Sequence, residues 1–259
     1  MIKLDRPAAP AALAAAKIQN TLRVLREKIA RGEKISTKDF PSSYWGEKSI
    51  KAALFGMHNG KCCFCERTRD KAREPDVEHF RPKAKVTEDA THPGYWWLAF
   101  NWNNLLWACK ACNEEYKRNH FPLDDPSTRV SAEGGDLSAE DLLLLDPAVD
   151  DCEQFFRYDW ISAPGLMVKM DAVDANPRGC SSIKILGLNR QDLLEERNRH
   201  IEYILKAIAF GIIVGRDQAA LEERKIDSIK KLKDMISPKS QFSGLARAYF
   251  STMHLSGYF

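Results

Sequence analysis

Hydrophobic residues recur at helical spacing in several separate stretches of the chain. The first stretch lies between residues 8 and 31 and contains Ile18, Leu22, Leu25 and Ile29. Steps of three or four positions place such residues on one face of an α-helix. A shorter helix is expected over residues 48–57, where a His58-Asn59-Gly60 turn would end it. The same spacing predicts helices over 177–187, 190–214 and 216–236.

Shorter apolar stretches predict a small amount of β-structure. The segments LLLLDPAVDDCEQFFRYDW (142–160) and GLMVKMDA (165–172) are typical of short strands. Residues 77–80 should form another strand, which Pro82 ends because proline offers no backbone donor to a strand ladder. Residues 124–140 contain many turn formers and are expected to be a linker or mobile loop. The chain is therefore predicted to be mainly α with a small β component.

Composition bounds the size of the fold and its partners. With 259 residues, of which 44% are hydrophobic and 29% charged, the chain can bury a sizeable core. A formal net charge of +3 is too small to indicate nucleic-acid binding by itself. Basic residues are nevertheless concentrated in one region, where they could neutralise phosphates or simply form a solvated surface. They are Lys61, Arg67, Arg69, Lys71, Arg73, Arg81, Lys83 and Lys85.

The sequence also indicates a cellular compartment. No apolar run approaches the roughly twenty residues that a membrane span requires. The first residues, MIKLDRPAAP, lack the hydrophobic segment of a signal peptide. Seven cysteines in a chain of this size fit a reducing compartment better than a disulfide framework. We therefore expect a cytoplasmic protein without a membrane partner.

Four of the cysteines have the spacing of metal ligands. Cys62 and Cys65 form one Cys-x-x-Cys pair, and Cys109 and Cys112 form another. Two such pairs complete the four-sulfur tetrahedral shell that zinc prefers, so a structural Zn²⁺ is predicted. Cys63 is an alternative to Cys62, although a single intervening residue before Cys65 makes a poorer turn. Cys152 and Cys180 have no partner at such spacing and are expected to be small buried residues.

The residues around these pairs suggest more than a structural site. Glu78 and His79 lie between the pairs, and Asn113 directly follows the last cysteine. A carboxylate, an imidazole and a carboxamide are the ingredients of a hard-metal site with its own general base. Four-cysteine sites are usually structural, and on spacing alone a binding ribbon would be favoured. Such a ribbon has no need for the acid-histidine pair or the asparagine, so these residues favour catalysis.

These motifs resemble the ββα-metal core of HNH endonucleases braced by a four-cysteine zinc site. The resemblance rests on KCCFCE, VEHFRPK and WNNLLWACKACNEEYK and covers residues 61–122. It implies that Glu78 and Asn113 bind a catalytic divalent ion and that His79 is the general base. Asn104 matches the asparagine that orients the loop. Many members of the family have Asp at the position of Glu78, and Asn119 or His120 could replace Asn113 as ligand.

The same resemblance implies a reaction and a substrate. Magnesium or manganese would assist the attack of water on a DNA phosphodiester, with neutral His79 accepting the proton, and the product would carry a 5′ phosphate. Arg81 and Lys83, just past the histidine, and Lys117, on the expected helix from Cys109 to Arg118, are the expected nucleic-acid contacts. Surface solubility would explain Arg81 and Lys83 almost as well. Four tryptophans nearby, Trp96, Trp97, Trp102 and Trp107, are expected to form local core rather than stack on bases.

Three regions are predicted: an N-terminal helical segment (1–60), the nuclease core (61–122) and a linker with a mostly helical region (123–259).

Together with the core motifs, LLLLDPAVDDC and ILGLNRQDLLEER resemble the PtuB group of HNH proteins. This group is encoded beside an ATPase in Septu antiphage defence systems and some retrons. The resemblance implies a DNA-degrading effector controlled by an ABC-type ATPase. A stand-alone nuclease, a zinc-braced binding module without catalysis and an interaction subunit remain alternatives.

Overall fold

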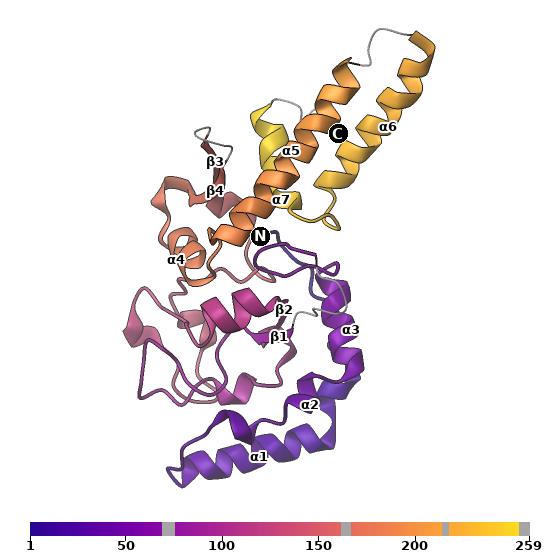
Figure 1. Cartoon of the computed structure of the whole chain (residues 1–259). Helices are drawn as coiled ribbons and strands as arrows, with labels where there is room; N and C mark the ends of the chain where they lie inside the picture. Colours follow the sequence, from indigo (N-terminus) through magenta and orange to yellow (C-terminus); the bar gives the residue numbers. More distant parts are fainter. Residues whose placement is uncertain (69–75, 162–166, 214–217, 254–259) are drawn as a thin grey trace.

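The protein is described by a computed structural model that covers residues 1–68, 76–161, 167–213 and 218–253. Its elements are arranged along an extended body (Figure 1). The N-terminal helices lie at one end, a two-stranded sheet lies in the middle, and a pair of long C-terminal helices forms the other end. Among the described helices, none has the length and apolar character needed to cross a bilayer.

The N-terminal region is helical, as predicted, but its first helix begins later than expected. A 3₁₀ turn at Ala11–Ala14 precedes helix α1 (Ala16–Ala30), and Ala15 between them has an extended backbone. Ile18 and Leu25 of α1 are buried. The short helix α2 (Ser42–Trp45) follows, and α3 (Lys48–Met57) has the predicted bounds. Gly60, with φ of +70°, completes the turn after α3.

The central sheet contains the predicted strand and a partner from the tryptophan-rich segment. Strand β1 (Asp76–His79) pairs antiparallel with β2 (Leu105–Ala108), and Glu78 lies opposite Leu106. All four residues of β2 are buried, and α3 packs against this strand. The tryptophans that flank or belong to β2 are core residues, as predicted. Trp96, Trp102 and Trp107 are buried, and Trp97 packs against the same core with partial exposure.

The segment that contains Cys112 and Asn113 is a π-helix (Ala111–Lys117), where a helix from Cys109 to Arg118 was predicted. The Arg118 N–H donates to the carbonyl of Asn113, five residues earlier, at 2.7 Å. A π-helix has this wider hydrogen-bond step and occurs frequently at functional sites.

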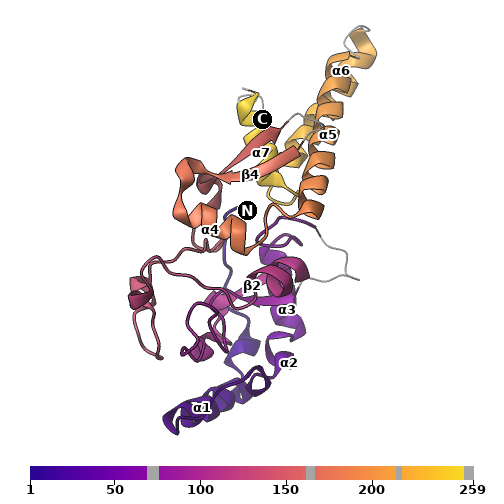
Figure 2. The ribbon, with the colours of Figure 1, turned by 60° about the vertical axis from the view of Figure 1, so that its left-hand side comes forward.

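The C-terminal region is built on a second antiparallel sheet of β3 (Phe156–Ile161) and β4 (Met167–Ala172). Helices α4 (Pro177–Ile185) and α5 (Gln191–Ile213) pack on β4, and α7 (Ser243–Thr252) packs on β3. Helix α6 (Gln218–Ile236) runs beside α5, and the pair extends away from the body (Figure 2). Helix α7 was not predicted. Residues 142–155 precede β3 as loop and a 3₁₀ turn, not as strand.

Buried hydrogen bonds to Glu66 and Lys61 attach the C-terminal helical region to the segment of the first cysteine pair. Glu66 follows Cys65, and its buried carboxylate accepts hydrogen bonds from Ser243 Oγ at 3.1 Å and the Gly244 N–H at 3.3 Å. Burial alone would raise the pKa of Glu66, but the amino group of Met1 and Lys61 outweigh it and lower this pKa. Lys61 also donates to the carbonyl of Ser240. The two regions therefore share one electrostatic interface.

The imidazole of His58 joins the end of α3 to the central sheet by two hydrogen bonds. These bonds require the ring to be neutral. Its Nδ1 lies 2.6 Å from the carbonyl of Leu54, so Nδ1 carries the proton, and its Nε2 accepts from the Trp107 N–H at 3.3 Å. A second proton, on Nε2, would remove this acceptor and point at the Trp107 N–H. Burial, the largest cause, lowers the pKa of His58 from 6.5 to about 4. The residue ends the helix, as its place before Asn59-Gly60 suggested.

This histidine makes stability depend on pH. The unfolded chain binds the His58 proton below pH 6.5, whereas the folded chain binds it only near pH 4, so stability is lost as pH falls through this window. We expect the protonation of His58 to remove about 3 kcal/mol of the free energy of unfolding between pH 7 and pH 4. The stability difference between the wild type and His58→Gln should therefore shrink on acidification, as followed by urea unfolding. A difference independent of pH would contradict this assignment.

Candidate functional site

The four cysteines predicted as metal ligands lie together. Their Sγ atoms are all within 4.8 Å of one another, and all four side chains are buried. The Sγ atoms of Cys65 and Cys109, from different pairs, are 3.7 Å apart. Ligands at the usual zinc-sulfur bond length would be about 3.8 Å apart in a tetrahedron. The cluster could therefore hold a metal such as zinc, and its donor set and spacing fit that ion.

Cys62 belongs to this cluster, and Cys63 lies outside it. The Cys63 backbone N–H donates to the carbonyl of Trp107, and burial raises the pKa of its thiol. Of the other two cysteines, Cys152 is buried, as expected, but Cys180 is exposed. Neither belongs to the cluster among the described residues.

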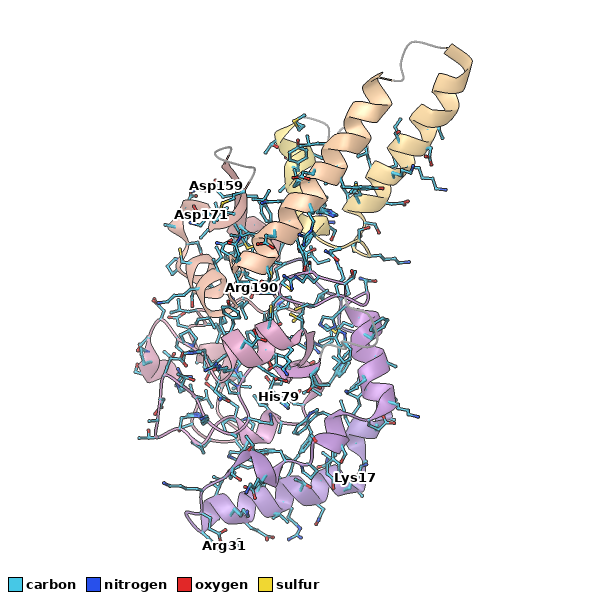
Figure 3. All side chains as sticks on the ribbon, in the orientation of Figure 1. Lys17, Arg31, His79, Asp159, Asp171 and Arg190 are labelled. Carbon is cyan, nitrogen blue, oxygen red and sulfur yellow. The ribbon has the colours of Figure 1, made fainter. Side chains whose placement is uncertain are left out.

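Arg190 contacts the cluster from the C-terminal region. Its guanidinium donates to Cys112 Sγ at 3.4 Å and to the carbonyl of Gly187 at 3.1 Å. Burial lowers the pKa of Arg190, but the negative thiolates, chiefly Cys112, outweigh it and raise this pKa. Figure 3 shows Arg190 at the start of α5, next to the central region that contains His79. Sequence reasoning did not assign this residue a role, although it lies in the ILGLNR motif.

Glu78 lies on β1 with its carboxylate inside the protein. Its Oε1 lies 2.5 Å from Lys117 Nζ, so the carboxylate is ion-paired inside the protein. Burial raises the pKa of Glu78, and the ammonium of Lys117 partly opposes this shift. A carboxylate is a suitable ligand for a hard cation, and the Lys117 ammonium supplies the positive charge beside it in this structure.

His79 follows on β1 with its ring nitrogens in distinct environments. Nε2 lies 2.9 Å from the carbonyl of Ala99, which can only accept, so Nε2 carries the proton. Nδ1 is then an acceptor and lies 3.5 Å from Lys83 Nζ. The ring packs edge-on against Trp45 at 4.9 Å between centroids. Burial, reinforced by Lys83, lowers the pKa of His79 and keeps the imidazole neutral.

Both asparagines of the predicted site are placed around these two residues. Asn104 is buried, accepts from the Arg81 N–H at 2.8 Å and donates to the carbonyls of Arg81 and Leu98. It thus orients the chain that leaves β1. Asn113, on the π-helix, lines a cavity of about 420 Å³ together with Glu78 and His79.

The alternatives to Asn113 lie differently. Asn119 lines the same cavity as Asn113. His120 instead binds Glu88, with its Nδ1 2.7 Å from Oε1, and lines a neighbouring cavity. The geometry thus leaves Asn119 as the nearer alternative ligand.

The basic residues near the site point in different directions. Lys83 lines the cavity, and burial lowers its pKa. Arg81 turns away from it, because its Nε donates to the buried carboxylate of Glu140 at 2.8 Å. Lys117 has 0% of its side chain exposed, because its Nζ lies between Glu78 Oε1 and the carbonyl of His79.

Other members of the basic region serve the fold. Lys61 is buried in its ion pair with Glu66, and Arg67 is buried against Asp192 and Glu196. Lys85 is exposed. The remaining three members lie outside the described residues: Arg69, Lys71 and Arg73.

Two groups that hold the ring of His79 were missed by sequence reasoning. They are the side chain of Trp45, from α2, and the backbone carbonyl of Ala99. Neither belongs to a motif, and a backbone carbonyl leaves no mark on the residue type. Only the folded arrangement brings them to the histidine.

Two curated proteins are similar to this chain. A Septu protein PtuB from Bacillus mycoides (strain KBAB4) is 36% identical over 204 residues, which are 76% of this chain and 66% of that protein. A Septu protein PtuB from Bacillus thuringiensis is 37% identical over 127 residues, 49% of this chain and 40% of that protein. The chain thus spans just under two thirds of the first relative and less than half of the second. These identities support assignment to the PtuB-type family. No family model matches the chain, and no solved structure matches it.

The cysteine geometry predicts which thiols hold metal. Purified protein should contain about one zinc per chain, and Cys109→Ser should lose both the metal and the folded core, because binding free energy in such sites is largely folding free energy. Cys63→Ser and Cys180→Ser are the controls, since both thiols lie outside the cluster, and they should retain zinc. Metal content by mass spectrometry and circular dichroism measure the two effects. Well-folded wild type without zinc would overturn the four-cysteine assignment.

Proposed function

We propose that this chain is a metal-dependent HNH endonuclease that hydrolyses DNA phosphodiester bonds as a component of a Septu antiphage defence system. The observation that carries the proposal is the environment of His79. A neutral imidazole, with Nε2–H bonded to a backbone carbonyl, leaves Nδ1 as the acceptor nitrogen, 3.5 Å from Lys83 Nζ, beside a cavity that Glu78 and Asn113 also line. This is the arrangement that a general base beside a hard-metal site requires.

The metal side of the proposal rests on donor chemistry. Glu78 and Asn113 would hold Mg²⁺ or Mn²⁺, since oxygen ligands suit these ions and both residues line the same cavity. When bound, the ion supplies charge stabilisation at the phosphate and the leaving oxygen. The four cysteines would hold zinc as a structural brace and leave catalysis to the neighbouring residues.

The residues of the chain then have separate tasks in hydrolysis. His79 Nδ1 accepts a proton from the attacking water, and the Nε2–H bond to the Ala99 carbonyl leaves this nitrogen unprotonated. Trp45 packs against the ring edge and limits its rotation. Lys83, whose ammonium lies 3.5 Å from Nδ1, is near enough to bind a phosphate oxygen beside the base. Cleavage with departure of the 3′ oxygen leaves a 5′ phosphate.

The structure changes the expected nucleic-acid contacts. Among the three basic residues first considered, Lys83 is the one that lines the cavity. Arg81 is occupied by Glu140, and Lys117 by Glu78. We therefore propose Lys83 as a phosphate contact and Lys117 as the positive charge that offsets the buried carboxylate of Glu78. Arg81 would support the loop.

The defence context rests on the names of the two relatives. By that likeness we propose that a co-encoded ABC-type ATPase controls the nuclease. Exposed apolar side chains on the projecting helices, Tyr203 on α5 and Ile226 on α6, are candidates for the contact.

Deleting residues 190–259 is unsuitable as a test of this contact, because Arg190 contacts the cysteine cluster and Ser243 contacts Glu66. Co-purification with Tyr203→Glu and Ile226→Glu variants tests the contact instead.

Substitution of His79 tests the general base. His79→Ala should reduce cleavage by about 10²–10⁴-fold, since it removes the proton acceptor. His79 is buried, so His79→Gln serves as a matched variant that keeps a polar side chain there without a basic nitrogen, and it should lose activity equally. Cleavage of plasmid DNA with added Mg²⁺ or Mn²⁺ is the measurement. Zinc content should stay at the wild-type level in both variants. Wild-type rates in either variant would show that the proposed mechanism is wrong.

The choice between Asn113 and Asn119 as ligand can be decided by metal binding. Asn113→Ala should weaken Mn²⁺ binding, as measured by electron paramagnetic resonance of free Mn²⁺, and high manganese should partly restore cleavage. Asn119→Ala is the matched control, because Asn119 lines the same cavity. We expect it to bind Mn²⁺ like the wild type. If Asn119→Ala weakened Mn²⁺ binding and Asn113→Ala did not, Asn119 would be the ligand instead.

A further inference from the structure

A second cavity, of about 290 Å³, lies beside the proposed catalytic one. We propose that it binds an unpaired nucleotide of the DNA strand, with the base on Tyr116 and the backbone phosphate between Arg118 and Lys184. The inference rests on the proposed function and makes it more specific, since it names a substrate with an unstacked base next to the scissile phosphate.

The two cavities are neighbours and share a lining residue. Arg118 lines both of them. Asn113 and Tyr116 belong to the same π-helix, three residues apart, and each lines one cavity. A strand whose phosphate reached Glu78 and His79 would therefore pass Arg118 before it reached the second cavity. Adjacent phosphates of one strand could occupy both.

Tyr116 is a rigid aromatic platform. Gly187 lies against the ring so closely that a Cβ there would be 2.2 Å from Cδ1, and its φ of +57° also favours glycine. The guanidinium carbon of Arg190 lies 5.6 Å from the ring centroid. Tyr116 also lines the second cavity, and 36% of the residue is exposed. An aromatic ring held in this way can stack on any base.

The charge of the cavity suits a backbone phosphate. Arg118 and Lys184 are exposed, and no carboxylate of the described residues lies within ion-pair distance of either charged group. Arg118 Nε donates only to the carbonyl of Glu114, at 3.2 Å. Glu115 is the one acidic residue among those that line the cavity. Two cations against one carboxylate leave the lining positive.

The Tyr116 ring and the two neighbouring cations together favour binding of an unpaired base over binding of an intact duplex. In a duplex each base is stacked on its neighbours and offers no free face. Binding on an aromatic ring with phosphate on flanking cations is the mode of single-stranded nucleic-acid recognition. The ILGLNR motif acquires a role here, because its Gly187 and Arg190 support Tyr116 while Arg190 also contacts Cys112.

A double-mutant cycle between the protein and the DNA tests this site. Full-length His79→Gln protein is used so that the DNA is not cut. Binding of fluorescent single-stranded oligonucleotides, each with one abasic position, is measured by anisotropy. Tyr116→Leu, which keeps an apolar contact with Gly187, should weaken binding of intact DNA about 5- to 150-fold.

The cycle also predicts how the abasic oligonucleotides behave. At one register position, removal of the base should weaken binding to protein that retains Tyr116 by the same factor. The same abasic oligonucleotide should bind the Tyr116→Leu variant no more weakly than intact DNA does, because the ring and the base would contribute through one shared contact.

Matched variants separate stacking and charge from folding. Tyr116→Phe keeps the ring and should bind like its parent. Arg118→Gln and Lys184→Gln should each reduce the slope of log affinity against log salt by about 0.7, whereas Lys169→Gln, at an exposed position of β4, should leave it unchanged. Unchanged zinc content shows that the cluster is intact.

The contradicting results are distinct from those for the nuclease itself. The inference is overturned if no abasic position couples to Tyr116, or if the chain binds no single-stranded DNA. Either result would leave the proposed nuclease standing, provided that His79→Gln abolishes cleavage of DNA. Continued cleavage by His79→Gln would instead remove the proposed mechanism, whatever Tyr116 does.

Discussion

The four-cysteine cluster is the interaction on which the rest of the structure depends. It joins residues 62–65 to residues 109–112 across the central sheet and so fixes both the end of β2 and the start of the π-helix. Four buried thiols within 4.8 Å of one another favour metal binding, because a cation compensates their charge as thiolates. Arg190 adds compensation from the C-terminal region. The free energy of metal binding is thereby coupled to folding of both regions.

The proposed catalytic groups lie next to this cluster in a buried environment. Burial raises the pKa of Glu78 and lowers that of His79, so each shift favours the neutral form. An imidazole must be neutral to act as a general base. A carboxyl group must be ionised to bind a metal, and the ammonium of Lys117 opposes its protonation. The low local dielectric also strengthens every charge interaction with a bound phosphate.

Sequence spacing predicted the parts of the molecule that local chemistry determines. Helix α3 matched its expected bounds because the turn at Gly60 needs a positive φ, and the cysteine pairs matched because two intervening residues suit one metal. The π-helix was not predictable, since its winding depends on contacts that residue spacing does not encode. Lys117 is buried through its ion pair with Glu78 on β1. Arg81 points to Glu140, 59 positions away, which no local pattern reveals. The roles of Glu78, His79 and Asn113 stay predictions.

Anomalous X-ray scattering from crystals grown with manganese tests the central claim most directly, because it locates each metal by element. The account predicts a zinc-edge peak equidistant from the four Sγ atoms of the cluster. It also predicts a separate manganese peak between the Glu78 carboxylate and the Asn113 carboxamide, within reach of water bound at His79 Nδ1. Manganese elsewhere in the protein, or a cluster that contains no zinc in well-ordered crystals, would contradict the account.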